Sequence, residues 1–401
     1  MKKILSLLLS ICLLLALLMT SALAEGEITV TEIQKYGNLV LSLSGSEFLA
    51  MGYAYGDVVT ATINGEDYEM PVGGNYSDVD QGTMICRVLV KEETGEDYLI
   101  LAINMGDLAT TAGIAVKEKI EADPGYVWHY QVKEPVAVSF AMKEQGGYYD
   151  QYVMHQLVRS EDRASYPDLT DEQYANFREV KVGNIGAGKL YRSSSPVNPE
   201  INRNREADAA AAAAGVKTFI NLADNEETMK AFEGFADSYS AGQKVICLNL
   251  GVDFAADDFK AGLAEGLRFI AANEPPFLVY CNEGKDRAGF ICAVLEALMG
   301  ATPEEITADY MATYYNYYGV QPGTEQYDVI AASNIQKSLT SAFHMADFFE
   351  GPDLVARAVH YMVEIGLSSE EYGAVFTKLL NGRIVPAAEP RISYLTLLTP
   401  R

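Results

Sequence analysis

The second half of the chain alternates short apolar segments with longer amphipathic ones. Strand patterns at Val216–Leu222, Lys244–Leu250 and Phe277–Cys281 are separated by helical patterns such as residues 257–269, and a further helical pattern follows at Ala288–Met299. Strands and helices that alternate at this length form a mainly parallel sheet with helices on its faces. Ligands of such sheets bind at the carboxyl ends of the strands, so the residues that follow each strand are the first candidates for a site.

The first half of the chain has a different rhythm. Residues 25–142 contain short stretches of period-two apolarity separated by turns, and Asn64-Gly65 is a strong hairpin signal. A closing strand is predicted at Val136–Phe140. We therefore predict an α/β fold whose mainly parallel sheet, flanked by helices, is preceded by a small antiparallel β barrel or sandwich domain.

The amino-terminal residues indicate export. Lys2 and Lys3 precede an apolar run that ends in small residues up to Ala24. This pattern predicts a signal peptide over residues 1–24, because the run is shorter than the roughly 20 residues that span a bilayer. The alternative is an uncleaved membrane anchor. The expected mature protein is secreted, either extracellular or associated with the cell surface.

The same pattern divides the rest of the chain. We expect a β domain over residues 25–142, a connecting region over 143–182, a catalytic domain over 183–385 and a carboxyl-terminal tail over 386–401.

Composition limits the possible partners and cofactors. The 30 Lys and Arg against 55 Asp and Glu give a formal charge of −25, which argues against nucleic-acid binding. A phosphate ligand would therefore need a local cationic pocket. Neither a disulfide framework nor a metal site is expected, and no cofactor, because there is no Cys-x-x-Cys pair and the His residues are scattered. The cysteines outside the signal peptide are Cys86, Cys247, Cys281 and Cys292.

The segment after the third predicted strand carries the chemistry. Cys281 stands at the carboxyl end of that strand, and Arg287 follows where a helix begins. A loop of this length can turn its backbone N–H groups inward to form an anion nest, to which the helix adds its positive amino end. Such surroundings favour a thiolate, and a planar guanidinium can hold two phosphoryl oxygens. The alternative is a buried strand cysteine beside an unrelated arginine.

The sequence YCNEGKDRAG around Cys281 resembles the Cys-x5-Arg phosphate loop of the protein tyrosine phosphatase superfamily. Its Gly-Lys-Asp-Arg interior is similar to bacterial tyrosine and phosphoinositide phosphatases, and LYRSSSP at Leu190–Pro196 is similar to an early segment of the same family. The resemblance implies that the Cys281 thiolate attacks phosphorus, that phosphocysteine forms, and that water then releases phosphate. The residues that it assigns to phosphate binding are Asn282, Glu283, Gly284, Lys285, Asp286 and Arg287.

The resemblance leaves the general acid open. Asp286 matches a loop aspartate of the family and is our first candidate; Asp253, which follows a neighbouring strand, is the second. Asp257 and Asp258 lie in the same segment, and Asp257 is predicted to cap a helix instead. Asp224 follows another strand end, in a segment that lacks the arginine that relatives often carry there.

Two positions depart from the family pattern. Tyr280 stands where the residue before the nucleophile is usually His, and Ala288 replaces a Ser or Thr whose hydroxyl helps the thiolate leave phosphocysteine. Slow hydrolysis of the intermediate is therefore expected, unless a hydroxyl from Ser193–Ser195 substitutes. Lys285 is a feature shared with enzymes that act on phosphoinositides, although it would also neutralise phosphotyrosine.

These observations together predict a secreted cysteine-dependent phosphatase of phosphate monoesters, with phosphotyrosine proteins as substrates. Phosphoinositides or inositol phosphates, as in a phytase-like enzyme, are the alternative substrates. A phosphate-binding pseudophosphatase and a surface adhesion protein that acts through its β domain, whose partner is unknown, are the alternative functions. We also predict that Cys292 or Cys247 shields Cys281 by disulfide exchange, and that the tyrosines between Tyr314 and Tyr318 pack in the core.

Overall fold

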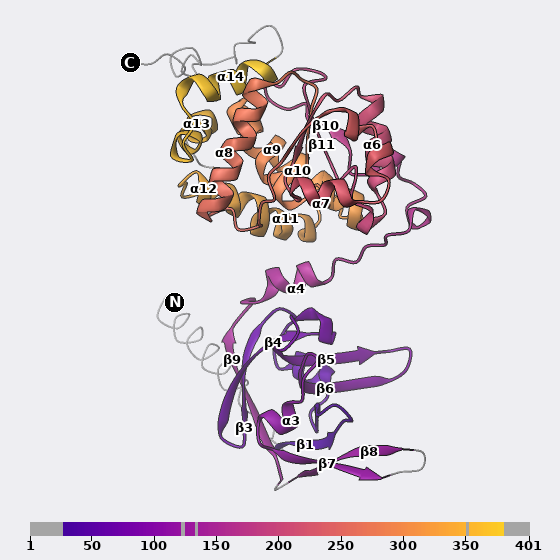
Figure 1. Ribbon diagram of the computed structural model, residues 1–401. Helices are drawn as coiled ribbons and strands as arrows, with labels where there is room; N and C mark the ends of the chain where they lie inside the picture. Colours follow the sequence, from indigo (N-terminus) through magenta and orange to yellow (C-terminus); the bar gives the residue numbers. More distant parts are fainter. Residues whose placement is uncertain (1–26, 122–124, 133–134, 350–352, 381–401) are drawn as a thin grey trace, which may run out of the picture. The chain divides into compact units, whose positions relative to one another are not determined.

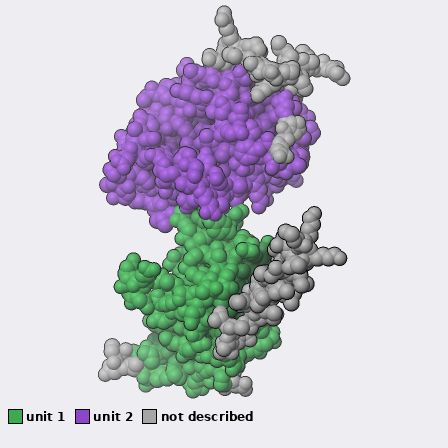
Figure 2. Space-filling view, turned by 180° about the vertical axis from the view of Figure 1, so that it is seen from behind, with its two compact units in different colours: residues 1–157 green, residues 158–401 purple. Residues whose placement is uncertain are grey.

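The computed structural model describes residues 27–121, 125–132, 135–349 and 353–380. The chain divides into two compact units, residues 1–157 and 158–401 (Figure 2). The predicted signal peptide and carboxyl-terminal tail lie outside the described residues, and the predicted connecting region is shared between the two units. In the part of the chain that the structure describes, no helix has both the length and the apolarity to cross a membrane.

Seven strands of the first unit close into a barrel in the order β1-β2-β6-β5-β4-β3-β9 (Figure 1). They are β1 (Ile28–Ile33), β2 (Leu39–Leu41), β3 (Val58–Ile63), β4 (Glu66–Gly73), β5 (Met84–Lys91), β6 (Glu96–Ile103) and β9 (Ala137–Glu144). The preceding β domain is therefore a barrel. It is not wholly antiparallel as predicted, because β4 and β5 run parallel: the chain between them passes through the short helix η1 (Tyr76–Asp78) instead of a hairpin turn.

Local sequence explains how this barrel closes. Asn64 and Gly65 have φ angles of 50° and 88°, the left-handed pair that a two-residue hairpin between β3 and β4 requires. The predicted closing strand is β9, which pairs with both β1 and β3. Phe48 fills the interior and stacks on Tyr53 with ring centroids 4.3 Å apart. The remaining elements of this unit are α2 (Gly45–Ala50), α3 (Leu108–Thr111), β7 (Ala115–Glu121), β8 (Tyr126–Val132) and α4 (Tyr149–His155).

The second unit contains a five-stranded sheet in the order β10-β11-β14-β12-β13. Its strands are β10 (Arg178–Glu179), β11 (Leu190–Ser193), β12 (Thr218–Asn221), β13 (Lys244–Cys247) and β14 (Phe277–Tyr280). The last four in spatial order are parallel, and only β10 pairs with its neighbour in the antiparallel direction. This confirms the predicted α/β fold with a mainly parallel sheet.

Helices bury both faces of this sheet (Figure 1). The helices of this unit are α5 (Asp171–Tyr174), α6 (Asn204–Ala213), α7 (Glu226–Ala231), α8 (Asp257–Ala272), α9 (Asp286–Leu298), α10 (Pro303–Tyr318), α11 (Glu325–Ala331), α12 (Lys337–Ala342), α13 (Leu354–Glu364) and α14 (Ser369–Leu379). Phe219, Leu278 and Tyr280 pack with α6, whereas Ile220 lies next to Gly266 of α8. Strands that are buried on both faces read as continuous apolar runs, which explains the pattern in the sequence.

The first residues of α10 and α8 show how well local sequence predicts the capping of a helix. Thr302 and Glu305 form a capping box at the start of α10, a pattern that can be recognised in the sequence. Helix α8, however, begins at Asp257 with Ala256 in the cap position and no side-chain cap, so the prediction that Asp257 caps this helix is wrong. Asp257 and Asp258 occupy the first turn instead, where the helix dipole favours negative charge.

Candidate active site

The parallel strands of the second unit end at one edge of the sheet. Ser193, Tyr280, Asn221 and Cys247 are in register across β11, β14, β12 and β13. The residues that follow these strands therefore gather at the same edge. Cys281 comes directly after β14, between the ends of β11 and β12, which is where a parallel sheet places its ligands.

Cys281 is enclosed by the surrounding chain. Its side chain is 3% exposed and its thiol is free. The chain then turns through residues 282–285 and enters α9 at Asp286. The first turn of a helix has backbone N–H groups without helical partners, so the amino end of α9 adds donors and positive potential next to the loop.

The loop is held from outside through its carbonyl oxygens. The contacts are Ser195 N to Asn282 O (3.0 Å), Asn176 Nδ2 and Tyr317 Oη to Glu283 O (3.0 and 2.8 Å), and Arg192 Nη2 to Gly284 O and Lys285 O (2.8 and 3.3 Å). In a trans peptide the N–H points opposite to the preceding C=O. The amides of residues 283–286 are therefore turned away from these donors, which is the geometry of an anion nest.

Two glycines permit this close packing. Gly284 has a φ of 66°, and a Cβ there would lie 2.2 Å from the carbonyl oxygen of Ser193. At Gly289 a Cβ would lie 2.6 Å from the ring of Tyr310 and 2.8 Å from Arg192 Nη2. No other residue fits either position without moving the loop or its support.

Arg287 joins the loop to the segment that follows β13. Its Nη1 donates to Leu250 O at 2.9 Å. Its Nε is buried and has no acceptor among the residues that the structure describes. A buried donor without a partner is costly, and an oxyanion in the nest would satisfy it. The guanidinium is thus anchored on one side and has a donor left for a phosphoryl oxygen.

The other charged side chains of the loop neutralise one another. Lys285 Nζ lies 3.0 Å from Glu283 Oε2 and 3.9 Å from Asp286 Oδ2, while Arg159 Nη1 lies 2.5 Å from Glu283 Oε1. Burial opposes the charge of Lys285, but the Asp286 and Glu283 carboxylates outweigh it and raise the pKa of this lysine. Across the described ranges, Arg287 is the loop cation without an ion-pair partner.

Asp286, the first candidate for the general acid, is the first residue of α9. Its side chain is 44% exposed. Desolvation within the loop is the largest influence and raises the pKa of Asp286, although the charge of Lys285 opposes this shift. A raised pKa keeps the carboxyl protonated at higher pH, which suits a proton donor to a leaving group.

Asp253, the second candidate, lies on a segment that is tethered at two points beside the loop. Arg287 binds Leu250 O, and Phe254 stacks on Phe290 of α9 with ring centroids 4.4 Å apart. Between these anchors Asp253 is exposed, and its carboxylate accepts a hydrogen bond only from an amide of the same segment among the described contacts. The structure thus brings both predicted acids to the edge that holds Cys281.

Asp224 is a further carboxylate at this edge, to which the sequence analysis gave no role. It is 7% exposed, and Asn221 Nδ2 donates to its Oδ2 at 3.1 Å. Burial raises the pKa of Asp224, whereas the hydrogen bond from Asn221 and the charge of Arg287 lower it. The signal in the sequence was its place after a strand end.

Tyr280 and Ala288, the two residues that depart from the family pattern, do not supply the polar groups that the family has at these positions. Tyr280 is fully buried among residues that pack with α6, and its hydroxyl contacts Met229 Sδ at 3.8 Å. Ala288 is fully buried in the first turn of α9.

The three serines at the end of β11 differ in how their hydroxyl groups are bonded. Ser193 and Ser194 donate their hydroxyls to the carbonyl oxygens of Ser194 and Ala175 at 2.6 and 2.8 Å. Ser195 Oγ instead accepts two backbone amides, and its own proton has no acceptor among the described residues. Ser195 is therefore the member of the run whose proton is available.

The sheet register contradicts the predicted exchange between Cys281 and Cys247. Strand β12 lies between β13, which ends at Cys247, and β14, which Cys281 directly follows. Neighbouring strands are about 4.8 Å apart, so the pair is separated by about 10 Å, beyond the roughly 7 Å that a disulfide allows. Cys292 is fully buried, and burial raises the pKa of its thiol. The exchange with Cys292 stays a prediction.

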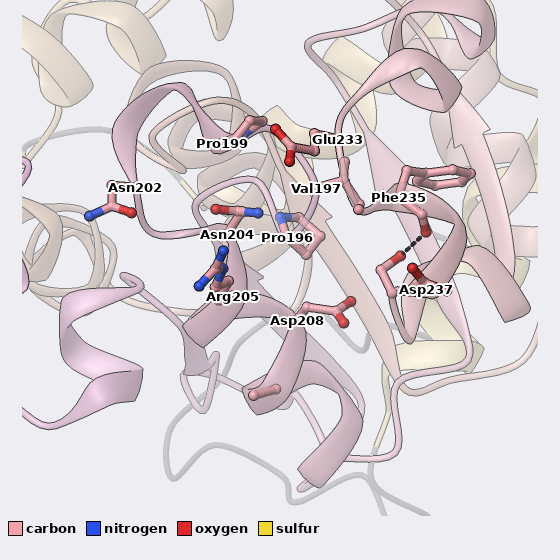
Figure 3. Close-up of a pocket in the computed structure, with 13 residues that line it drawn as sticks. Pro196, Val197, Pro199, Asn202, Asn204, Arg205, Asp208, Glu233, Phe235 and Asp237 are labelled. Atoms are coloured by element: carbon pink, nitrogen blue, oxygen red, sulfur yellow. Dashed lines mark hydrogen bonds between the residues drawn. The ribbon is translucent and has the colours of Figure 1, made fainter.

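A cavity of about 440 Å³ adjoins the segment after β11 (Figure 3). Asn204 and Arg205 of α6 line one side of it, and Glu233 and Phe235 line the other. Pro196, which follows the serine run, also lines it. The cavity is thus a neighbour of the phosphate loop and separate from it. No group of three or more His, Cys, Asp or Glu side chains suited to a metal ion occurs in the described ranges.

Sequence reasoning missed the residues that support the loop. Tyr314 and Tyr317 are fully buried, as predicted, whereas Tyr315 is 37% exposed, so core packing holds for only part of this run. Tyr317 also holds a loop carbonyl. Arg192 and Asn176 received no role, although Arg192 lies in a segment that resembled the family. The available signal was a charged residue inside a strand that is otherwise apolar.

Several solved structures resemble parts of this chain. One is an uncharacterized conserved protein from Thermotoga maritima, with 18% identity over 28% of this chain and 35% of that chain, and a TM-score of 0.21. Two more are the core catalytic domain of the PP-IP phosphatase SIW14 from S. cerevisiae in complex with citrate (21% identity, 39% and 83%, TM-score 0.26) and a Siw14 catalytic core (19%, 42% and 89%, TM-score 0.24). No curated protein sequence matches this chain.

Family models match both units of the chain. The SAM hydroxide adenosyltransferase C-terminal domain matches residues 28–121, which form most of the barrel. The tyrosine phosphatase family matches residues 171–381, just over half of the chain, and this range includes the sheet, the phosphate loop and both candidate acids. The chain therefore belongs to the tyrosine phosphatase family.

Proposed function

We propose that this protein is an exported, cysteine-dependent phosphatase of phosphate monoesters, and that phosphotyrosine proteins are its substrates. The observation that carries the proposal is the loop after β14. There a buried, free cysteine is followed by amides that turn away from the scaffold and by an arginine with a donor to spare. Such preorganised donors stabilise the charge that develops on a transferring phosphoryl group. Export rests on the pattern of residues 1–24.

In the first proposed step the Cys281 thiolate attacks phosphorus in line with the leaving oxygen. The S–P bond forms as the P–O bond breaks, and the departing oxygen takes a proton from Asp286. The amides of the loop and the Arg287 guanidinium hold the equatorial oxygens. This division of work is nucleophilic catalysis supported by electrostatic stabilisation.

In the second step water attacks phosphocysteine. The P–S bond breaks, the sulfur leaves as thiolate, and the carboxylate of Asp286 takes the proton from water before inorganic phosphate departs. The residue after Arg287 is alanine, so it cannot donate to the leaving sulfur. Ser195 supplies the hydroxyl in this proposal, because its proton has no acceptor in the described part of the chain.

The charges around the loop favour phosphotyrosine over inositol polyphosphates and phosphoinositides. A polyanionic substrate needs more than one free cation, but Lys285 is already paired with Glu283 and Asp286. Phosphotyrosine peptides, phosphoinositides and phytate should be assayed side by side at matched concentration. Higher turnover of an inositol phosphate or phosphoinositide would overturn this choice of substrate.

A pseudophosphatase is the second candidate, and Ala288 is the observation that favours it, because the helper hydroxyl of the family is missing. Purified protein would then bind phosphate or vanadate but release no phosphate above a Cys281→Ser control. Phosphate release that depends on Cys281 supports the enzyme.

In the alternative hypothesis of a surface adhesion protein, the barrel is the functional part of the chain. It is tested by deleting residues 25–142 and measuring both phosphatase activity and cell-surface binding. Surface binding that survives the deletion would contradict it. Amino-terminal sequencing of exported protein tests the signal peptide, since an intact amino terminus would contradict cleavage after Ala24.

A further inference from the structure

A buried cluster of charged side chains contacts the phosphate loop, and the reaction above does not use it. Arg192 is fully buried, and its Nη1 lies 2.6 Å from Asp309 Oδ2. Asp309 also accepts a hydrogen bond from Arg178 Nε at 2.8 Å. Buried ion pairs are expensive to desolvate, so stability alone is a weak reason for such a cluster. Its contacts with the loop suggest what else it does.

Arg192 reaches the loop with the arm that does not bind the carboxylate. Its Nη2 donates to Gly284 O at 2.8 Å and to Lys285 O at 3.3 Å, while Nη1 is fixed by Asp309. The planar guanidinium joins these contacts rigidly, which a lysine ammonium on a flexible chain cannot do. Asp309 therefore fixes, through Arg192, the positions of two successive peptide groups of the loop.

A second route through the cluster reaches the preceding peptide group. Arg178 Nη1 donates to Asn176 Oδ1 at 2.7 Å, and Asn176 Nδ2 donates in turn to Glu283 O at 3.0 Å. Thr313 Oγ1 accepts hydrogen bonds from both Arg178 and Asn176.

Helix α10 underlies both routes. Asp309, Thr313 and Tyr317 are spaced by four residues, so they lie along one face of this helix. Each of the three binds either the loop itself or a side chain that holds it. One helix face thus supports three consecutive loop carbonyls.

We propose that Arg192, fixed by Asp309, is a positioning residue of the phosphate loop. It holds the carbonyl groups of Gly284 and Lys285 toward the scaffold, and it thereby aims the amides of Lys285 and Asp286 at a bound phosphoryl group. The inference rests on the proposed function, since it assumes that this loop binds a phosphoryl group. Arg192 does not touch the substrate in this scheme.

The charge of the cluster agrees with this role. Glu296 of α9 is 1% exposed, and burial, assisted by the charge of Asp309, raises its pKa well above its ordinary value. Asp309 is the reverse case, because Arg178 and Arg192 overcome its burial and lower its pKa. When Glu296 is protonated, two arginines face one carboxylate, and the net positive charge stabilises an anion in the nearby loop.

The test replaces Arg192 with methionine and measures three properties of the full chain. They are kcat and KM on p-nitrophenyl phosphate, the inhibition constant of orthovanadate, and the pH dependence of Cys281 alkylation by iodoacetamide. A misaimed loop is expected to lower kcat/KM by about 100-fold, to weaken orthovanadate by a similar factor, and to move alkylation of the thiol to higher pH. If Arg192 served folding alone, neither the orthovanadate inhibition constant nor the pH dependence of alkylation would change in protein that remains folded.

Arg163 supplies a matched control. It donates to the carbonyl oxygens of Tyr166 and Leu169 and to Asp171, as Arg192 does to its own partners, but it contacts no loop residue among the described hydrogen bonds. Arg163→Met is expected to leave orthovanadate inhibition and the alkylation profile within about twofold of the unchanged protein.

Arg192→Lys keeps the test decisive if the methionine variant does not fold. Lysine retains the charge but cannot bind Asp309 and both carbonyl oxygens together, so partial loss is expected, intermediate between methionine and arginine. Either variant would overturn the proposal if it melted like the unchanged protein and kept its orthovanadate constant and alkylation profile. Because these two readouts need no turnover, they decide the proposal even if the unchanged protein hydrolyses none of the substrates, which would contradict the proposed function instead.

Discussion

The two sides of the phosphate loop differ in how they are held. On the scaffold side, Arg192, Asn176 and Tyr317 are buried or nearly buried and fix consecutive carbonyl groups. On the acid side, Asp286 is 44% exposed. The segment at residues 250–258 on the same side is attached through Leu250 and Phe254, and Asp253 between them is exposed. Oxyanion binding requires donors that are in place beforehand, whereas proton donation tolerates a group that approaches with the substrate.

This difference predicts separable defects. Changes on the scaffold side should weaken both anion binding and turnover. Loss of the proton donor should lower turnover of difficult substrates and leave anion binding intact. The predictions below test this separation, beginning with the residue on which both sides depend.

Cys281→Ser is expected to abolish turnover, with a loss of about 10⁵-fold or more, because the alcohol is a far weaker nucleophile at neutral pH. Phosphate release from p-nitrophenyl phosphate measures this loss. Orthophosphate should still bind with an affinity within about tenfold, since the amides of the loop remain. Turnover close to that of the unchanged protein would remove Cys281 from the mechanism.

Arg287→Lys is expected to lower kcat/KM by about 10³-fold, because lysine keeps the charge but loses the planar pair of donors. Arg287 also binds Leu250 O, so this change should loosen the acid side as well as the nest. The measurement is kcat/KM together with the orthovanadate inhibition constant. Loss of turnover with undiminished orthovanadate inhibition would show that Arg287 serves the acid side alone.

Asp286→Asn is expected to lower kcat by about 100-fold on phenyl phosphate, whose leaving group needs a proton, and far less on p-nitrophenyl phosphate. The raised pKa of Asp286 adds a pH signature. A general acid works while protonated, so kcat should fall as the pH rises through this pKa, and the variant should lose that limb.

Asp253→Asn is the matched comparison for the acid. If Asp286 is the donor, this variant should keep the leaving-group dependence and the alkaline limb of the unchanged protein. The reverse result, with both features lost in Asp253→Asn and kept in Asp286→Asn, would move the proton donor to the segment after β13.

Glu296→Gln is expected to have the smallest effect on activity and a pH-dependent effect on stability. Burial raises the pKa of Glu296 in the folded protein, so unfolding releases a proton once the pH exceeds the ordinary carboxyl value. The stability that this group contributes is therefore complete at low pH and is lost as the pH rises. Glutamine does not titrate, so the Tm of the variant should rise relative to the unchanged protein between about pH 5 and pH 8.

An exposed glutamate provides the control for this titration. Glu265→Gln on α8 is expected to change Tm little at any pH, because surface substitutions are usually near neutral. A Tm difference for Glu296→Gln that stayed constant with pH would show that Glu296 is ionised in the folded protein.

Much of the second unit was predictable because its signals are local. The buried strands β12 and β14 and the partly exposed edge strand β13 have apolar sequences, and the capping box at Thr302 marked the start of α10. The spacing of Cys281 and Arg287 indicated the loop and its place at a strand end. The parallel pairing of β4 with β5 was missed, because strand direction depends on where a connection crosses and the alternation of apolar residues is the same in both directions.

The sequence alone determined that Cys281 would lie between a buried strand and a helix, and that Arg287 would follow it at the end of a short loop. Tertiary structure decided which way the peptide groups of that loop face. Their orientation depends on Arg192 of β11, Asn176 before β10, and Tyr317 of α10. These partners are distant in sequence and meet only when the sheet and α10 pack together. The direction of a peptide plane carries no local sequence signal, because it is set by whichever donor reaches its carbonyl oxygen.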